Sequence, residues 1–88
     1  MIIDFDPVKS AKNLADRDVP FMCVVDFDWV SASVVVDNRH AYPEQRLVAI
    51  GYLNEHLHVL CFTPIAGGIR VISLPRANKR EVSRYENP

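Results

Sequence analysis

Two apolar segments in the second half of the chain are separated by only two residues, and this spacing constrains the fold more than any other feature. Residues 45–53 and 56–63 are both largely apolar, and Asn54 and Glu55 stand between them. Two such segments with a two-residue connection predict a β-hairpin. The chain therefore has to build an antiparallel sheet.

The residues after this hairpin predict another strand and a terminal helix. Pro64–Gly68 contains two glycines, which adopt positive φ readily, and residues 69–74 follow as an apolar strand. Asn78 with Glu81 three residues later resembles a capping box, so a helix is expected from there to Tyr85. Few of its side chains are apolar, so much of this helix must face solvent or a partner.

The N-terminal half predicts two helices and a short strand. Asp6 is a favourable N-cap for a helix that ends near residues 16–18. Residues 21–29 combine helical spacing with β-branched content, and their spacing and acidic residues favour a short helix. Residues 33–36 are expected to form a strand, followed by a polar loop over 37–43. The order predicts one α+β domain over residues 1–88, with N-terminal helices, an antiparallel sheet of about four strands and a C-terminal helix, the helices packing on one face of the sheet.

Charge is distributed unevenly along the chain, although the net charge is only −1. Residues 1–37 hold seven acidic and three basic residues (−4), whereas residues 69–88 hold five basic and two acidic residues (+3). A basic end on an otherwise acidic protein indicates a local site for a polyanion rather than general affinity for nucleic acid. The alternative is a basic helix that is merely solvated.

Several classes of protein are excluded by what the sequence lacks. There is no apolar run of membrane-spanning length and no signal peptide, and the two cysteines are isolated, so a cytoplasmic protein with no membrane association is expected. His56 and His58 have no further ligand at metal spacing and are expected to be two exposed strand histidines. Motifs for phosphate-binding loops, dinucleotide binding and hydrolase triads are missing, so no metal or cofactor is expected.

The first polar cluster precedes the hairpin. Its members are Asp37, Arg39, His40, Tyr42, Glu44 and Arg46. His40 and Glu44 are candidates for proton transfer beside two guanidinium groups. The alternative is a solvated loop in which Glu44 pairs with Arg46.

The second polar cluster follows the last predicted strand. Its members are Arg70, Arg76, Lys79, Arg80, Arg84 and Tyr85. On a helix, Arg76, Arg80 and Arg84 would form one basic stripe, which suits phosphate groups because arginine binds them in bidentate fashion. Tyr85 either stacks on a base or packs against the sheet.

The residues in and around these clusters resemble the BrnT family. The segment Asp37–Gly51 is similar to the family pattern in which a His, a Glu and an Arg lead into a strand that ends in Gly. Arg70–Ser73, Arg76–Glu81 and Arg84–Glu86 are similar to the closing signature of the family, and Phe5–Lys9 is similar to its first helix. The resemblance covers nearly the whole chain.

This resemblance implies a RelE-like fold and the function of a toxin in a type II toxin–antitoxin system, which cleaves RNA without a metal and so inhibits translation. It also implies neutralisation by a BrnA-type antitoxin with a ribbon–helix–helix domain, which alone reads the operator DNA. The assembly stays open between a homodimer and a toxin–antitoxin heterotetramer.

The same resemblance implies the roles of the site residues. The residues assigned to catalysis are His40, Glu44, Arg46, Arg70 and Arg80, and those assigned to RNA binding are Arg76, Lys79, Arg84 and Tyr85. Their side chains are expected to converge on one phosphate-sized spot. Pro75 stands where the family usually has an arginine, with Arg76 beside it. The alternative function is therefore a catalytically weakened homologue that only binds an antitoxin.

Overall fold

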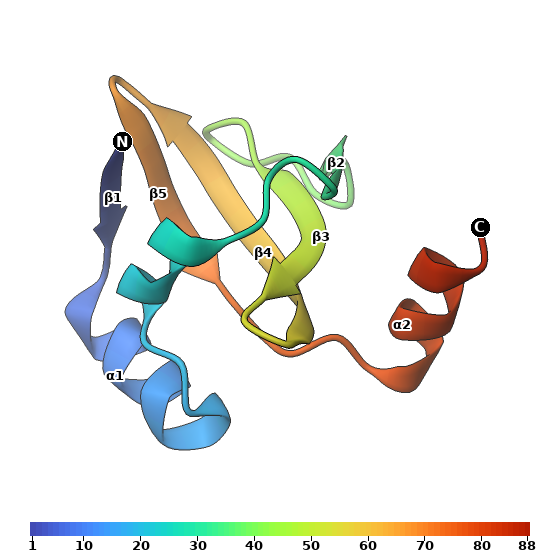
Figure 1. Cartoon of the computed structure of the whole chain (residues 1–88). Helices are drawn as coiled ribbons and strands as arrows, with labels where there is room; N and C mark the ends of the chain where they lie inside the picture. The colour runs from blue at the N-terminus through green and yellow to red at the C-terminus, as the bar shows by residue number, and fades with distance from the viewer.

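The computed structural model describes all 88 residues, which build a five-stranded sheet flanked by helices (Figure 1). The elements in chain order are β1 (Ile2–Phe5), α1 (Pro7–Arg17), the 3₁₀ helix η1 (Phe21–Asp26), β2 (Ser33–Val36), β3 (Leu47–Leu53), β4 (His56–Ile65), β5 (Gly68–Ser73) and α2 (Lys79–Glu86). The strand order is β1-β5-β4-β3-β2, and only the β1–β5 pair is parallel. The predicted α+β class is confirmed, with one strand more than expected.

The additional strand, β1, pairs with a strand far along the chain. Ile2 pairs with Gly68 and Phe5 with Val71, and the amide of Ile2 donates a hydrogen bond of 2.9 Å to the carbonyl of Gly67. A Cβ on Gly68 would lie 1.9 Å from the carbonyl oxygen of Ile2, so this close approach requires glycine. Four residues before a helix carry no local signal for such a distant parallel pairing.

The N-terminal helix begins and ends where the sequence predicts. The side chain of Asp6 accepts a hydrogen bond of 2.8 Å from the amide of Val8, Pro7 starts α1, and Asp18 ends it in the left-handed conformation. The next segment is helical as expected, but it forms the 3₁₀ helix η1 and ends at Asp26. Ser10 of α1 holds its start, because its hydroxyl accepts a hydrogen bond of 3.0 Å from the amide of Phe21.

The hydrophobic core lies between the sheet and η1. It contains Val19, Phe21, Val24, Phe27, Ala49, Leu53, Leu60, Phe62, Ile69, Val71 and Leu74. Trp29 packs edge-on between Phe27 and Phe62, with ring centroids 4.9 and 5.4 Å away. The face of the sheet that these side chains cover is the core face, and the opposite one is the outer face.

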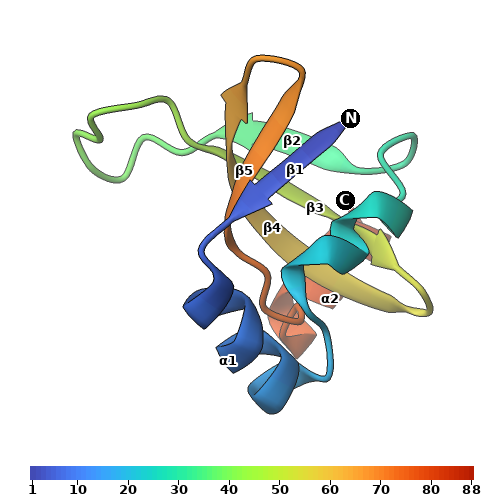
Figure 2. The same ribbon diagram turned by 90° about the vertical axis from the view of Figure 1, so that its left-hand side faces the viewer.

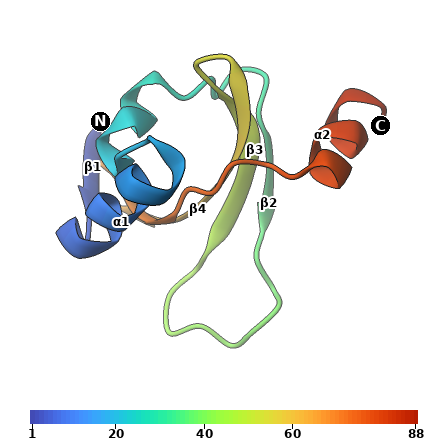
Figure 3. The same cartoon turned by 90° about the horizontal axis from the view of Figure 1, so that it is seen from below.

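The C-terminal helix lies on the other side of the sheet from α1 and η1 (Figure 3). The expectation that all helices share one face is therefore wrong. The capping box is confirmed, with Asn78 and Glu81 joined by hydrogen bonds of 2.8 and 2.9 Å. No residue of α2 is buried. The ring of Tyr85 packs edge-on against Tyr52 and its hydroxyl donates to the carbonyl of Ser31, while the hydroxyl of Tyr52 donates to Glu86 at 3.2 Å. The helix has few apolar side chains, and this explains its loose attachment.

The loop between β2 and β3 extends away from the sheet (Figure 2) and is anchored by one carboxylate. The side chain of Asp37 is 1% exposed and accepts two hydrogen bonds of 2.8 Å from the guanidinium of Arg39. Tyr42 donates a third bond of 3.3 Å, and the amide of Asp37 donates to the carbonyl of Arg46 at 2.8 Å. The bonds from Arg39 hold the pKa of Asp37 well below its usual range. The loop is thereby tied at both ends.

The closest packing in the core predicts the effect of Gly51→Ala. A Cβ at Gly51 would lie 2.7 Å from Cζ of Phe27, so the ring would have to move. We expect a loss of about 1–3 kcal/mol in the free energy of unfolding, as for other overpacked core positions. Urea unfolding measures this change. The exposed strand residue Ser33 is the control, since Ser33→Ala should alter stability by less than about 0.5 kcal/mol; equal effects of both variants would contradict the packing argument.

The lowered pKa of Asp37 predicts how stability depends on pH. Because the folded-state pKa lies below the unfolded value of about 3.9, the carboxylate stabilises the fold above that value and loses this effect as the pH falls. Asp37→Asn should therefore be less stable than wild type at pH 7, and the difference should shrink between about pH 5 and pH 2. Thermal unfolding across this range tests it, with the exposed Asp26→Asn as control. Parallel profiles of wild type and Asp37→Asn would refute the linkage.

Candidate functional site

Five polar residues from five neighbouring strands lie side by side across the sheet. Thr63 of β4 pairs with Arg70 of β5, and Arg70 pairs with Asp4 of β1. On the other side of Thr63, Arg46 extends β3 by one residue, and its carbonyl binds the amide of Asp37 after β2. Directly opposed residues point to the same face of a sheet, so these side chains form one line, here called the polar row.

The polar row lies on the outer face, because its members alternate with core residues along each strand. Leu47, Phe62 and Val71 follow or precede row members directly and pack in or against the core. Beside the row is a groove of about 490 Å³, here called the outer groove. It is lined by Val35, Val36, Asp37, Asn38, Arg39, Val48, Ile50, Val59, Cys61, Ser73, Pro75 and Glu81. The outer groove thus joins the β2–β3 loop to the start of α2.

Arg70 is shared between two carboxylates from distant parts of the chain. Its Nε donates to Asp4 at 2.9 Å, and its Nη1 donates to Glu44 at 3.4 Å. The hydrogen bond with Asp4 is the main reason that the pKa of Arg70 is raised. Arg70 and Glu44 are 43% and 39% exposed, so solvent reaches this ion pair. The structure thereby brings together one predicted residue from each of the two polar clusters.

Arg46, Tyr42 and His40 form a stack at the base of the loop. The guanidinium carbon of Arg46 lies 4.2 Å above the centre of the Tyr42 ring, within the range of cation–π attraction. The His40 ring meets Tyr42 edge-on, with centroids 5.7 Å apart. Both Arg46 and His40 line a shallow hollow of about 410 Å³ that also contains Glu44. Glu44 pairs with Arg70 rather than with Arg46, so the expected pairing within a solvated loop does not form.

Thr63 and Asp4 belong to the site but are not candidates from the sequence. Neither belongs to a polar cluster along the chain, and only the strand register places them beside Arg70. The one sequence signal that could have pointed to Thr63 is that it is a polar residue in the otherwise apolar run of β4. That signal does not reveal which side chain stands opposite.

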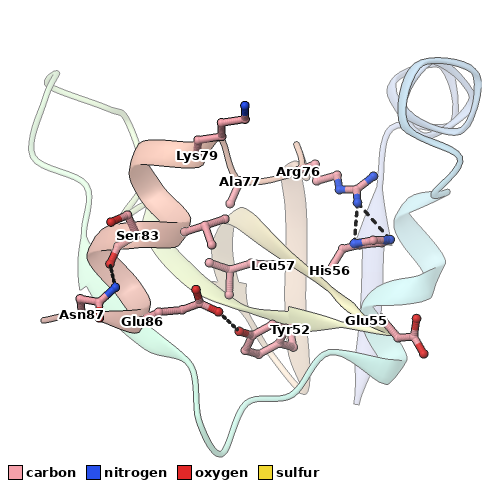
Figure 4. Close-up of a pocket in the computed structure, with 11 residues that line it drawn as sticks. Tyr52, Glu55, His56, Leu57, Arg76, Ala77, Lys79, Ser83, Glu86 and Asn87 are labelled. Carbon is pink, nitrogen blue, oxygen red and sulfur yellow. Dashed lines mark hydrogen bonds between the residues drawn. The ribbon is translucent and has the colours of Figure 1, made fainter.

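Arg76 lies away from the polar row. The helix begins at Lys79, and Arg76 instead forms an isolated bridge with His58 of β4. Its Nη2 lies 3.0 Å from Nε2 of His56 in a hollow of about 620 Å³ between β4 and α2 (Figure 4). His58 and Thr63 are five positions apart, which is about 17 Å along a strand. The predicted stripe of three helical arginines is therefore wrong, because only Arg80 and Arg84 lie on α2.

The basic residues predicted on α2 are exposed, whereas Tyr85 faces the sheet. Arg80 and Arg84 are exposed and form no ion pair, and Lys79 borders the hollow of Figure 4. Arg84 and Tyr85 line a smaller hollow of about 210 Å³ over β2 and β3. Of the two roles left open for Tyr85, the structure shows packing against the sheet.

His58 is buried, contrary to the expectation of two exposed strand histidines. It is 3% exposed, and it stands between Gly51 of β3 and Arg76 of the segment after β5, which crosses the start of β4. Two backbone hydrogen bonds hold this crossing, from Val59 to Pro75 at 2.9 Å and from Ala77 to Leu57 at 2.8 Å. Burial lowers the pKa of His58 below its usual value. The histidine is thus part of the packing that fixes the approach to α2.

No group of three or more His, Cys, Asp or Glu side chains is arranged to hold a metal ion. None of the helices has the length and apolar character needed to cross a bilayer.

Comparison with known proteins identifies the family. A family described as "Ribonuclease toxin, BrnT, of type II toxin-antitoxin system" matches residues 5–81. A search among curated proteins found no match to the chain. The family match spans the β2–β3 loop, four of the five members of the polar row and the start of α2. This chain therefore belongs to the BrnT family of ribonuclease toxins of type II toxin–antitoxin systems.

Proposed function

We propose that this protein is an endoribonuclease toxin with a RelE-like fold, which cleaves RNA at the polar row without a metal ion and so inhibits translation in the cytoplasm. The family supplies the class of activity. The observation that carries the assignment to this site is the contact between Glu44 and Arg70, with Arg46 in the same row. A carboxylate can accept the proton of the ribose 2′-hydroxyl, and guanidinium groups beside it can stabilise the charge that develops on the phosphate.

The spacing of the row suits one phosphodiester group. Arg46 and Arg70 stand on strands on either side of β4, so their backbones are two strand spacings, or about 10 Å, apart. Side chains of this length can reach a common phosphate from both sides. Their positive charge stabilises the negative charge that builds up on the phosphoryl oxygens during attack. Asp4 and Asp37 lie at the two ends of the row and hold the surrounding framework in place.

The proposed reaction is an internal attack on the phosphodiester. The 2′-oxygen of ribose forms a bond to phosphorus, the bond to the 5′-oxygen of the next nucleotide breaks, and a 2′,3′-cyclic phosphate remains. Glu44 or His40 takes the proton of the 2′-hydroxyl, and the leaving 5′-oxygen takes up a proton from water. Glu44 is the better placed base, since it contacts Arg70, whereas His40 contacts the ring of Tyr42. Residues Lys79, Arg80 and Arg84 extend the basic surface along α2 for the flanking RNA.

The proposed partner is a BrnA-type antitoxin whose ribbon–helix–helix domain binds the operator DNA. Type II systems have a protein antitoxin, and this chain offers an unpaired strand edge to one. Val34, Val35 and Val36 of the edge strand β2 are all exposed, and such an edge is normally covered by a partner. Either a toxin–antitoxin heterotetramer or a toxin homodimer would cover this edge of β2.

One observation favours the second candidate, a catalytically weakened toxin that only binds its antitoxin. The usual arginine of the family is replaced by Pro75, and the neighbouring Arg76 contacts His56 rather than the row. This position of Arg76 supports the weakened candidate over a substitution of the missing arginine by Arg76.

The polar row predicts the effect of removing its central charge. Arg70→Ala should lower the cleavage of a fluorescent RNA at least about 100-fold, as for other losses of a group that stabilises the transition state. Arg80→Ala should mainly raise KM, because Arg80 lies on α2 and contacts no row residue. Arg17→Ala removes the same charge from α1 and serves as the control. Full cleavage by Arg70→Ala, or loss of wild-type cleavage in EDTA, would refute the proposed mechanism.

Expression without the antitoxin distinguishes the two candidate functions. An active toxin should arrest growth on induction, and Glu44→Gln should relieve the arrest because the proton acceptor is lost. Absence of arrest by the wild type, together with tight binding of the antitoxin in a pull-down, would establish the binding-only candidate. Immunoblotting of both proteins verifies equal expression.

A further inference from the structure

Two buried side-chain atoms of the polar row have no hydrogen-bond partner, and they belong to neighbouring members of the row. They are Oγ1 of Thr63 and Nε of Arg46. Thr63 is only 4% exposed, so water does not reach its hydroxyl. Buried polar groups in folded proteins nearly always have a partner, and leaving one unpaired costs stability. Two such atoms in adjacent positions indicate a place where a ligand completes the hydrogen bonding.

The chemistry of these atoms specifies the missing partner. Nε–H of Arg46 can only donate, and the hydroxyl of Thr63 can donate as well. The guanidinium of Arg70 lies on the other side of Thr63 and adds further donors. Three donor groups in a line, two of them charged, match an acceptor with several oxygens and negative charge. A phosphodiester has this chemistry, whereas a cation or an apolar ligand does not.

The Glu44 carboxylate currently occupies part of this place. Its contact with Arg70 is 3.4 Å, longer than the 2.7–2.9 Å that is usual for a hydrogen bond between charged groups, and about 40% of each side chain is exposed. An exposed ion pair of this kind is weak. A phosphate can therefore displace Glu44 from Arg70, and its access to the buried Thr63 hydroxyl requires a neighbouring side chain, such as Arg46 over the Tyr42 ring, to move.

We propose that Thr63 is a direct phosphate ligand, and that its hydroxyl, Nε of Arg46 and the guanidinium of Arg70 bind one phosphodiester group. The identity of the ligand as RNA rests on the proposed function, but the anion site itself does not. Binding releases Glu44 from Arg70 and leaves its carboxylate free to accept the proton of the 2′-hydroxyl. The binding of the phosphate therefore also frees the Glu44 carboxylate to act as the base.

The test is Thr63→Val, which keeps the branched shape and removes the hydroxyl. The probe is a fluorescent 2′-O-methyl RNA decamer, which cannot be cleaved by 2′-hydroxyl attack, and binding is measured by fluorescence anisotropy at low salt. We expect about tenfold weaker binding, the loss typical of one hydrogen bond to a charged group, together with an unchanged or higher Tm because an unpaired buried group is removed. Thr63→Ser restores the hydroxyl and should recover most of the affinity.

Two results would overturn the assignment of Thr63. One is wild-type affinity in Thr63→Val, and the other is a fall in the Tm of Thr63→Val that Thr63→Ser does not show, which would mean that the hydroxyl has a structural role. Ser83→Ala removes an exposed hydroxyl from α2 and controls for the loss of a hydroxyl elsewhere.

The outcome also separates this inference from the proposed function. If binding depends on Thr63 but the wild type does not cleave ordinary RNA, the anion site stands and the proposed ribonuclease activity is rejected. If Thr63→Val binds and cleaves RNA as the wild type does, the proposed ribonuclease activity stands and Thr63 is rejected as a ligand.

Discussion

The register between β4 and its two neighbours is the constraint on which the site depends. Thr63 faces Arg70 on one side and Arg46 on the other only in this register. A shift of one residue would turn both arginines toward the core face and expose the apolar residues that now pack there. Burial of the core side chains thus enforces the position of the charged groups. The free energy gained by packing the core therefore fixes where the charged side chains of the row lie.

The polar row combines groups that stabilise the fold with groups that do not. Its ends are satisfied, since Asp37 is bound by Arg39 and Asp4 by Arg70. Its centre is not, because Thr63 and Arg46 each keep an unpaired buried atom. Proteins commonly depart from complete hydrogen bonding where a ligand binds. The contrast between a well-bonded edge and an unsatisfied centre is what marks this part of the outer face as a site rather than as a structural ion-pair network.

The two segments that border the outer groove are attached to the sheet in different ways. The β2–β3 loop is tied through the buried carboxylate of Asp37, whereas α2 has no buried residue and rests on Tyr85. Free energy for local opening is lowest where little apolar surface is buried. The wall of the groove that contains α2 is therefore the more easily displaced one. An RNA strand or a protein partner that enters the groove would contact a fixed wall at the β2–β3 loop and a displaceable wall at α2.

The sequence by itself determined the local elements: the capped start of α1 at Asp6, the strand β2, the hairpin at Asn54 and the capping box at Asn78. Each depends on interactions between residues close in the chain, so the residue types and their spacing suffice. It also identified Glu44 and Arg70 as candidates that converge on one spot, without showing which atoms contact each other. Only the tertiary structure decided the parallel pairing of β1, the burial of His58, the exclusion of Arg76 and the place of Thr63 in the row. These depend on contacts between distant segments, which the burial of a common core selects and which no local pattern encodes.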